Sequence, residues 1–478
     1  MFKGDLMIWD FFVISTAIIA MYMAIMDNKS PETTIAWLLI FVIYPPIGLI
    51  LYLFLGINWK RKTLINSHSK EIKDLINPYI AALENKEYKN LVELLATNSD
   101  SPIFVNNEVE IFGDGEEKFK ALKRELEKAK HHIHLEYYIV NDDNIGREIK
   151  DILIRKSNEG VKVRFIIDKM GSIKLSRSYI RELRENGVTV EMYSYFLAPL
   201  FRFINTQINY RNHRKIVVID GKVAFTGGMN IGDEYLGKGK LGYWRDTHMM
   251  IKGDGVLGLQ GIFLDDFLTI EKASNSYSFF GEDFDKYFPA SIGRGNKVMQ
   301  LVKSGPESEF PSIMQGIIKM IFMAKESIYI VSPYFVPTES VMEAIKIAAL
   351  GGVKVKIVFP KKWDHAVVYF ASRTYLQELV ECGVEVYSYR DDAFIHSKII
   401  TVDSKICSVG TANMDRRSYE LNYEVNCVFY DEEITKRLED IIKEDISVSK
   451  LTTYEDFKEE PFYIKIYGKI CRIVSSLL

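Results

Sequence analysis

Two long apolar segments lie near the start of the chain, at residues 6–26 and 35–57. Each is close to the roughly 20 apolar residues that a helix needs to cross a bilayer, and a short polar linker separates them. A signal peptide is the alternative for the first segment, but no small-residue cleavage site follows it. Pro45 and Pro46 predict a kink in the second helix. The basic residues 60–62 follow directly, so the positive-inside rule places the N-terminus and the rest of the chain in the cytoplasm.

From about residue 100 the chain alternates between strand-like and helix-like patterns. Residues 116–130 have apolar residues at helical spacing, and residues 132–140 then have the pattern of a strand. Residues 147–160 predict a second helix, which the glycine at its end terminates, and residues 161–168 predict the next strand. This order predicts a sheet whose strands are joined by helical crossovers.

The second half of the chain repeats the first. Segments match in the same order and at similar offsets: 129–140 with 324–335, 161–168 with 353–360, and 185–195 with 381–391. This pattern indicates an internal duplication with changes in the loops. We predict an α/β fold of two tandem units, each a mixed β-sheet flanked by helices, related by a pseudo-two-fold axis. The predicted parts are an anchor of two transmembrane helices at 1–60, a helical linker at 61–100, the first unit at 101–290, the second unit at 291–450 and an amphipathic tail at 451–478.

Composition narrows the classes of function. The net charge is −3, whereas a general nucleic-acid binder needs a basic field, so we expect no nucleic-acid partner. The four cysteines form no C-x-x-C pair, so no structural zinc is expected. His131, His132 and His134 alternate along a predicted strand, which makes a metal site there improbable.

Two segments share one arrangement of polar residues: HRKIVVIDGKVAFTGGMN at 213–230 and HSKIITVDSKICSVGTAN at 396–413. Each has a histidine, a lysine two residues later, an acid seven residues after the histidine, and G-x-x-N at its end. One H-x-K-x4-D alone is most simply an amphipathic strand, but two full copies are not a chance match. The candidate site residues are His213, Lys215, Asp220, Gly228 and Asn230, with His396, Lys398, Asp403, Thr411 and Asn413.

Strand geometry divides each segment into two faces. The dipeptide Asp220-Gly221 predicts a two-residue hairpin turn, which puts His213 opposite Gly228. The lysine and asparagine of the segment then share the face of the histidine. The second copy, built in the same way, puts His396 opposite Thr411. The small residue leaves room for a bulky anion, and the acids are expected to hold the turns.

Two such faces brought together would supply two histidines, two lysines and two asparagines. Lysine and asparagine can neutralise the oxygens of a phosphodiester, one histidine can attack the phosphorus, and the other can transfer protons. This chemistry needs no metal and no cofactor. Asp246 and Glu424 follow the two segments at similar distances and are candidates for fixing the histidine tautomers. A surface ion pair is the alternative for either acid.

At these residues the chain resembles the phospholipase D superfamily, whose motif is H-x-K-x4-D-x6-G-[GS]-x-N. The resemblance covers roughly residues 100–445, and Thr411 stands where serine is usual. The two-helix anchor, the phrase NYRNHRKIVVIDG and the ending RIVSSLL are similar to bacterial cardiolipin synthases. The resemblance implies transfer between two phosphatidylglycerol molecules, giving cardiolipin and glycerol. It also implies a catalytic set of His213, Lys215, Asp220, His396, Lys398 and Asp403, with His213 as nucleophile and His396 as acid and base.

Other functions share the same predicted site. A hydrolytic phospholipase D or a phosphatidylserine synthase would differ only in what resolves the intermediate, and a membrane-tethered nuclease is disfavoured by the charge. The expected location is the cell membrane, with an integral anchor and a cytoplasmic catalytic part. Segments 196–210 and 462–478 are each expected either to enter the membrane surface or to pack on the domain.

Overall fold

The computed structural model describes residues 2–26, 31–43, 45–52, 87–193, 210–274, 283–290, 293 and 295–475. The chain folds into two compact units. The smaller unit holds Met1–Leu64 and Ser194–Tyr210, and the larger unit holds Ile65–Tyr193 and Arg211–Ser476. The predicted apolar segment 196–210 lies, apart from Tyr210, outside the described residues.

In its described residues the smaller unit forms the helices α1 (Phe2–Met26), α2 (Pro31–Ile43) and α3 (Pro45–Leu51). The predicted second span is therefore interrupted where the two prolines occur, because proline favours the first turn of a new helix. Within the described parts of the chain, no helix meets the length and hydropathy that crossing a membrane requires. The predicted pair of spans is thus not confirmed.

Aromatic side chains hold these helices together. The Trp37 and Phe41 rings lie 6.0 Å apart, and Tyr52 packs edge-on against both at 5.1 and 5.4 Å. The remaining surface is apolar as well: Phe11 and Val42 are 74% and 66% exposed. Apolar side chains on all sides are what a helix surrounded by lipid needs.

The larger unit is built on one fifteen-stranded sheet with the order β19-β13-β12-β10-β15-β16-β18-β9-β1-β8-β6-β5-β2-β3-β4. The first half supplies β1 (Ile103–Phe112), β2 (His132–Tyr137), β3 (Lys162–Asp168), β4 (Thr189–Tyr193), β5 (Ile216–Ile219), β6 (Val223–Gly227) and β8 (His248–Gly253). The second half supplies β9 (Lys297–Ser304), β10 (Ser327–Val331), β12 (Lys354–Phe359), β13 (Glu385–Ser388), β15 (Ile399–Val402), β16 (Ile406–Gly410), β18 (Glu424–Phe429) and the edge strand β19 (Lys450–Thr452).

The strand order is symmetric about its centre. Strands β1 and β9 pair antiparallel there, and outward from them β8 corresponds to β18, β6 to β16, β5 to β15, and β2, β3 and β4 to β10, β12 and β13. In each half the three outermost of these strands are parallel and the others antiparallel. The predicted duplicated α/β fold with mixed sheets is confirmed.

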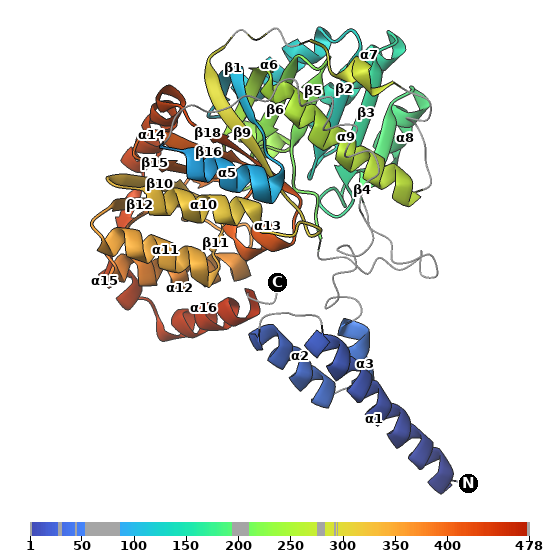
Figure 1. The fold of residues 1–478 in the computed structure, drawn as a ribbon, viewed down its shortest axis with the longest axis vertical. Coiled ribbons are helices and arrows are strands. Elements are labelled where there is room, and N and C mark those ends of the chain that lie inside the picture. The colour runs from blue at the N-terminus through green and yellow to red at the C-terminus, as the bar shows by residue number, and fades with distance from the viewer. Residues whose placement is uncertain are drawn as a thin grey trace. The chain divides into compact units, whose positions relative to one another are not determined.

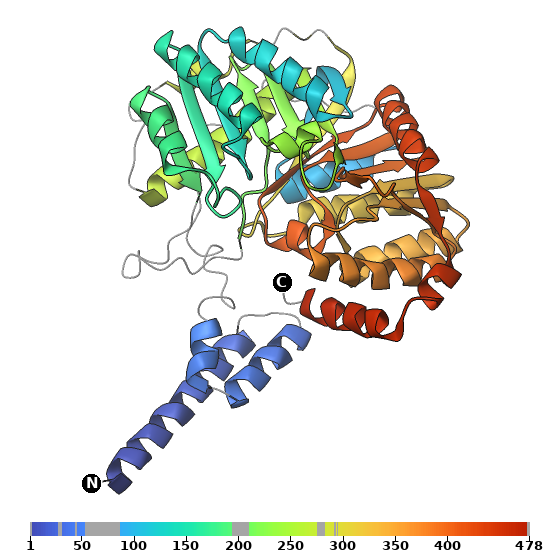
Figure 2. The ribbon, with the colours of Figure 1, turned by 180° about the vertical axis from the view of Figure 1, so that it is seen from behind.

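Helices cover both faces of the sheet. In the first half α6 (Gly115–Glu127), α7 (Asn144–Asn158) and α8 (Arg177–Glu185) pack on one face, and α9 (Gly255–Ser274) packs on the other (Figures 1 and 2). In the second half α10 (Ser312–Met323), α11 (Glu339–Leu350) and α12 (Ala366–Glu381) lie opposite α14 (Glu432–Ser447). The remaining helices are α5 (Lys89–Ser99), α13 (Arg416–Glu420), α15 (Tyr454–Lys458) and α16 (Phe462–Ser475).

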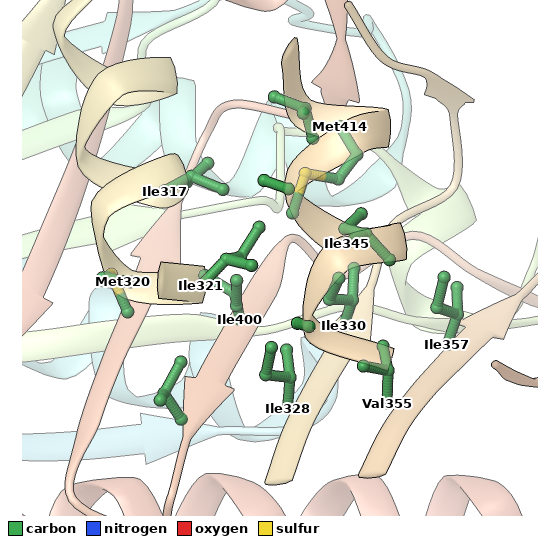
Figure 3. Packing of buried hydrophobic residues seen from close by; sticks show 14 of the residues in the cluster. Ile317, Met320, Ile321, Ile328, Ile330, Ile345, Val355, Ile357, Ile400 and Met414 are labelled. Carbon is green, nitrogen blue, oxygen red and sulfur yellow. The ribbon is translucent and has the colours of Figure 1, made fainter. Parts of the chain in front are cut away.

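Helix α5 precedes the first half in sequence but packs on the second. Its Leu91 and Leu95 are fully buried in the same cluster as Ile317 and Met320 of α10. Figure 3 shows how α10 and α11 cover the strands of this half, with Ile330 beneath them. Burial of each such side chain contributes about 1.5–3 kcal/mol, so α5 is part of the folded domain.

The hairpin of each motif differs from its predicted register. Ile219 pairs with Val223, and Val402 pairs with Ile406, so each turn has three residues instead of two. The prediction that His213 lies opposite Gly228 and His396 opposite Thr411 is therefore wrong. Asp220 and Gly221 both have positive φ, at 54° and 64°, and the third loop residue shifts the register by one.

The acid of each motif ties its turn to another strand. The Asp220 carboxylate accepts backbone N–H groups of Lys130, His131 and His132, at 2.9, 2.8 and 3.0 Å. Asp403 accepts the equivalent three N–H groups at the start of β10, those of Lys325, Glu326 and Ser327, each at 2.8 Å. Both acids thus hold turns, as strand parity predicted, at the end of the hairpin away from the histidines.

We expect Asp403→Asn to lower the free energy of unfolding by about 1.5–3 kcal/mol, because it weakens hydrogen bonds to a charged acceptor. Turnover per folded molecule should be unchanged. Denaturant unfolding of the full chain in detergent measures the first quantity, and activity normalised to folded protein measures the second. Asp391→Asn, at an exposed carboxylate, is the matched control. An inactive Asp403→Asn enzyme of normal stability would contradict this role.

Candidate active site

His213 lies immediately before β5, held by a segment of the other half. Asn212 forms a parallel bridge with Tyr423, and the His213 N–H donates to the Tyr423 carbonyl at 3.0 Å. This pairing brings the next residue, Glu424, to the imidazole. Its two carboxylate oxygens lie 3.0 and 2.9 Å from His213 Nδ1.

His396 is held in the same way by the first half. Strand β14 (Ala393–Ile395) pairs parallel with β7 (Tyr243–Arg245), and the His396 N–H donates to the Arg245 carbonyl at 2.7 Å. Asp246 follows and places Oδ2 2.7 Å from His396 Nδ1. Each histidine is therefore oriented by an acid of the opposite half, which sequence order did not reveal.

The two lysines lie under their histidines. Lys215 Nζ donates to the His213 carbonyl at 2.7 Å, and Lys398 Nζ donates to the His396 carbonyl. Lys398 Nζ is also 2.9 Å from His396 Nδ1 and 4.0 Å from Asp246 Oδ2. All six residues are buried, with exposed fractions of at most 8%. The structure thus brings the predicted His, Lys and acidic residues together.

Burial and mutual charge set the protonation of these groups. Burial lowers the pKa of His213 to about 4, although Glu424 favours its charged form. Burial also lowers the pKa of His396, and that of Lys215 to about 7. Burial would raise the pKa of Glu424, but His213 and Lys215 hold it below its usual value. The resting site thus pairs anionic carboxylates with neutral imidazoles.

The small residues of the two motifs, Gly228 and Thr411, lie beside the acids that orient the histidines, Asp246 and Glu424. A Cβ at Gly228 would lie 2.1 Å from Asp246 Oδ1, so glycine makes room for that carboxylate. The expectation that it admits an anion is wrong. Thr411 Oγ1 accepts the Val425 N–H at 2.9 Å, and its hydroxyl lowers the pKa of Glu424 through a hydrogen bond.

The predicted asparagines are also engaged. Asn230 accepts the Ile139 N–H at 3.1 Å and donates to the Tyr235 hydroxyl at 2.7 Å. Asn413 donates to Ser418 Oγ at 3.4 Å, and its buried Oδ1 has no hydrogen-bond partner within the described residues.

Motif spacing missed several neighbours of the histidines. The Tyr138 ring lies 5.0 Å from His213, and the Trp244 ring lies 5.5 Å from His396. Arg214 donates to Asp266 and, at 3.2 Å, to the Glu424 carbonyl, so it helps to hold the orienting acid. A basic residue between His and Lys in a buried strand was a signal, because buried arginine requires an anionic partner.

The arrangement can carry out two-step displacement at phosphorus. Each imidazole contacts its acid through Nδ1, which leaves Nε2 as the reacting atom. The lysines supply positive charge for a phosphodiester. Within the described ranges, no three His, Cys, Asp or Glu side chains are grouped so that they could hold a metal ion. His132 and His134 instead bind Gln260, at 2.9 and 2.8 Å.

Known proteins resemble the chain over the regions that build this site. The family described as "Cardiolipin synthase, PLD-like domain" matches residues 122–240 and 317–446, which contain the two motifs. The family "Phospholipase_D-nuclease N-terminal" matches residues 13–56. The fold resembles the phosphatidylserine synthase of Haemophilus influenzae, with a TM-score of 0.64 and 15% identity, over 81% of this chain and all of that one.

Curated relatives match almost end to end. The major cardiolipin synthase ClsA of Bacillus subtilis is 41% identical over 481 residues, covering 98% of both chains. A cardiolipin synthase of Listeria monocytogenes is 42% identical over 468 residues, covering 95% of both. Identity at this level therefore extends over almost the whole of this chain. The chain belongs to the cardiolipin synthase family of the phospholipase D superfamily, and it is a phosphatidyltransferase.

Proposed function

We propose that the protein joins two phosphatidylglycerol molecules into cardiolipin and releases glycerol, through a covalent phosphohistidine. The observation that carries this proposal is the reciprocal pairing of the two histidines with acids of the opposite half. This pairing supplies two imidazoles of fixed tautomer in one site. Transfer through an intermediate needs one nucleophile and one group that moves protons, and the two imidazoles can fill these two roles.

In the first step, His213 Nε2 attacks the phosphorus of the donor lipid. A P–N bond forms, the P–O bond to glycerol breaks, and His396 gives its proton to the departing glycerol oxygen. We assign the nucleophilic role to His213 from the family resemblance, and burial suits it to that role by keeping its pKa near 4, so that it is neutral at pH 7. Glu424 stabilises the positive charge that develops on its ring.

In the second step, the neutral His396 removes the proton from a glycerol hydroxyl of the second phosphatidylglycerol. That oxygen attacks phosphorus, the P–N bond breaks, and cardiolipin leaves. His396 ends the cycle protonated, as it began. The phosphodiester brings a negative charge between the rings and raises the pKa of His396. His396 therefore takes up a proton from solvent when the substrate binds, although burial disfavours its charged form in the free enzyme.

The full-length chain in detergent, given phosphatidylglycerol with a labelled headgroup and no nucleotide, should release glycerol and form cardiolipin. His213→Ala and His396→Ala should each lose about a thousandfold or more of this activity while remaining folded, because the two residues act as one unit. His131→Ala, at an exposed histidine, is the control. Phosphatidic acid as the sole product would indicate hydrolysis instead, and substantial turnover by either alanine variant would contradict a shared site.

The orienting acids should shift opposite limbs of the pH profile. Each carboxylate raises the pKa of its histidine, so removing its charge lowers that pKa. Asp246→Asn should move the alkaline limb of kcat, set by the proton donor His396, to lower pH. Glu424→Gln should move the acidic limb, set by the nucleophile His213, to lower pH. Both should reduce kcat by about 10²–10⁴-fold.

Measured pH profiles of the two variants check this assignment directly. If Asp246→Asn shifts the acidic limb and Glu424→Gln the alkaline one, His396 is the nucleophile. Trapping provides a second test: His396→Ala, denatured with detergent at alkaline pH, where a phosphohistidine survives, should retain labelled phosphatidyl on the protein, and His213→Ala should not.

We further propose that the enzyme works at the cytoplasmic face of the cell membrane, held by residues 1–60 and by α16. Helix α16 docks on α12: Cys471 is buried against Ala371, and the Tyr467 ring packs edge-on against Phe370 at 5.1 Å. Its opposite face is apolar and exposed, formed by Phe462, Tyr463, Ile466, Ile470 and Ile473. Lys465 and Lys469 border that face. An apolar helix face bordered by lysines suits an anionic lipid surface. We therefore propose that this helix packs on the domain with one face and enters the membrane surface with the other.

A fluorophore sensitive to polarity tests this orientation. The full chain, with Cys382→Ser to remove the partly exposed thiol, is labelled at Ile470→Cys and reconstituted into phosphatidylglycerol vesicles. Emission should move to shorter wavelength, and brominated lipids should quench it. The same label at Ile173→Cys, a residue 70% exposed in the first half, should stay water-like. Identical spectra at both positions would place α16 away from lipid.

A further inference from the structure

Two buried ion pairs of arginine and aspartate lie beside the orienting acids. Arg214 donates to Asp266 of α9, and Arg245 Nε donates to Asp445 Oδ1 of α14 at 3.1 Å. All four residues are buried, and the helices α9 and α14 cover the same face of the sheet in their two halves. Apolar side chains often stabilise a protein as well as a buried ion pair does, so stability alone does not account for these two pairs.

Each arginine holds the backbone of an orienting acid. Arg214 Nε donates to the Glu424 carbonyl at 3.2 Å, and Arg245 Nη1 donates to the Asp246 carbonyl at 2.7 Å. The carboxylates of these same two acids contact Nδ1 of the histidines. The aspartate on the helix fixes the guanidinium group, and the guanidinium group fixes the carbonyl. Each orienting acid is therefore tied at its backbone as well as at its side chain.

Both arginines also connect the two halves of the chain. Arg214 packs over the ring of Tyr423, at 5.2 Å, although the two residues belong to different halves. Arg245 donates to the hydroxyl groups of Thr247 and Ser397, each at 3.1 Å. Ser397 lies between the histidine and the lysine of the second motif. Each guanidinium group thus contacts the segment of the histidine and the segment of the acid.

The two arginines come from different positions of the duplicated chain. The residue after the motif histidine is Arg214 in the first half and Ser397 in the second. The residue before the orienting acid is Arg245 in the first half and Tyr423 in the second. Each histidine–acid pair thus has one arginine, supplied once by the segment of the histidine and once by the segment of the acid. The same contact made from two chain positions indicates a requirement of the site.

We propose that the two arginine–aspartate pairs are positioning pairs: each fixes the backbone of an orienting acid so that its carboxylate stays on Nδ1 of the histidine. This inference rests on the proposed function, because the tautomer must be fixed only if the histidines react through Nε2. The pairs act through the acids and not on the substrate.

Replacing both members of a pair separates positioning from folding. Arg245→Met alone leaves the Asp445 carboxylate buried without a counter-charge and should destabilise the full-length protein. Arg245→Met with Asp445→Leu removes both charges, so stability should return close to that of wild type. The Asp246 carbonyl has lost its donor in both variants. In the double variant, kcat for cardiolipin formation should therefore still fall by about tenfold to a hundredfold, because a small displacement of a reacting group causes such a loss.

The pH profile of kcat is the measurement that a purely structural role would not change. The Arg245 double variant should shift the same limb as Asp246→Asn, also toward lower pH, because a displaced carboxylate favours the charged imidazole less. Arg214→Met with Asp266→Leu should shift the limb that Glu424→Gln shifts. The other charged groups that act on the two histidines are unchanged in these variants; they are Lys215, Lys398 and Asp364.

Arg245→Lys is a second test, which keeps the positive charge beside Asp445. Lysine lacks the rigid fork with which arginine bonds a carboxylate and a carbonyl at the same time. kcat should fall by less than in the double variant, and the limb set by Asp246 should again shift toward lower pH. An unchanged profile in this variant would contradict the positioning role even if the double variant did not fold.

Lys297→Met is the matched control. Lys297 of β9 pairs with Asp431 at 3.2 Å, and Asp431 caps the opposite end of α14 from Asp445. The substitution also breaks a largely buried ion pair on the same helix, but this pair does not hold an orienting acid. Stability should fall, whereas kcat per folded molecule and both limbs of the pH profile should stay as in wild type.

The outcomes are distinguishable. Double variants with the kcat and pH profile of wild type would overturn the inference, because the acids would then keep their places without the arginines. Lower kcat with both limbs unchanged would also overturn it and leave the pairs with a role in folding alone. If wild type forms phosphatidic acid and no cardiolipin, the proposed function fails, but the comparison of limbs in that hydrolysis still tests the positioning role.

Discussion

Each motif histidine is held by a carboxylate from the other half of the chain, and the rest of the candidate active site depends on these two contacts. The pairs His213–Glu424 and His396–Asp246 span 211 and 150 residues of sequence. Neither half on its own has both members of either pair. Two buried imidazoles, two buried lysines and two buried carboxylates are tolerable only together, because any of these charges would be costly to bury alone.

The sheet makes this reciprocal arrangement permanent. Strands β1 and β9 pair at the centre, so the two halves share one hydrogen-bonded layer and cannot separate like domains on a linker. Two short parallel pairings, β14 with β7 and Asn212 with Tyr423, fix the position of each acid relative to its histidine, because each acid directly follows a paired residue.

Much of the fold and the core of the site could be predicted from sequence. Apolar periodicity gave the strand and helix order, and the two copies of H-x-K-x4-D gave the histidines and lysines. The hairpin register could not be predicted, because Asp220-Gly221 allows both two-residue and three-residue turns, and only the paired strands decide. The identity of the orienting acids was predictable, but which acid serves which histidine depends on contacts between distant segments.

Within the shared motif, the two turn aspartates contribute to folding, and the histidines and lysines form the candidate active site. Asp220 and Asp403 each fasten a hairpin to the start of a neighbouring strand, whereas the histidines and lysines lie at the other end of that hairpin. A descendant that kept both aspartates and lost both histidines would still have the architecture and would bind without turnover. In a genome, the aspartate therefore marks ancestry, and the histidine with its lysine marks an enzyme.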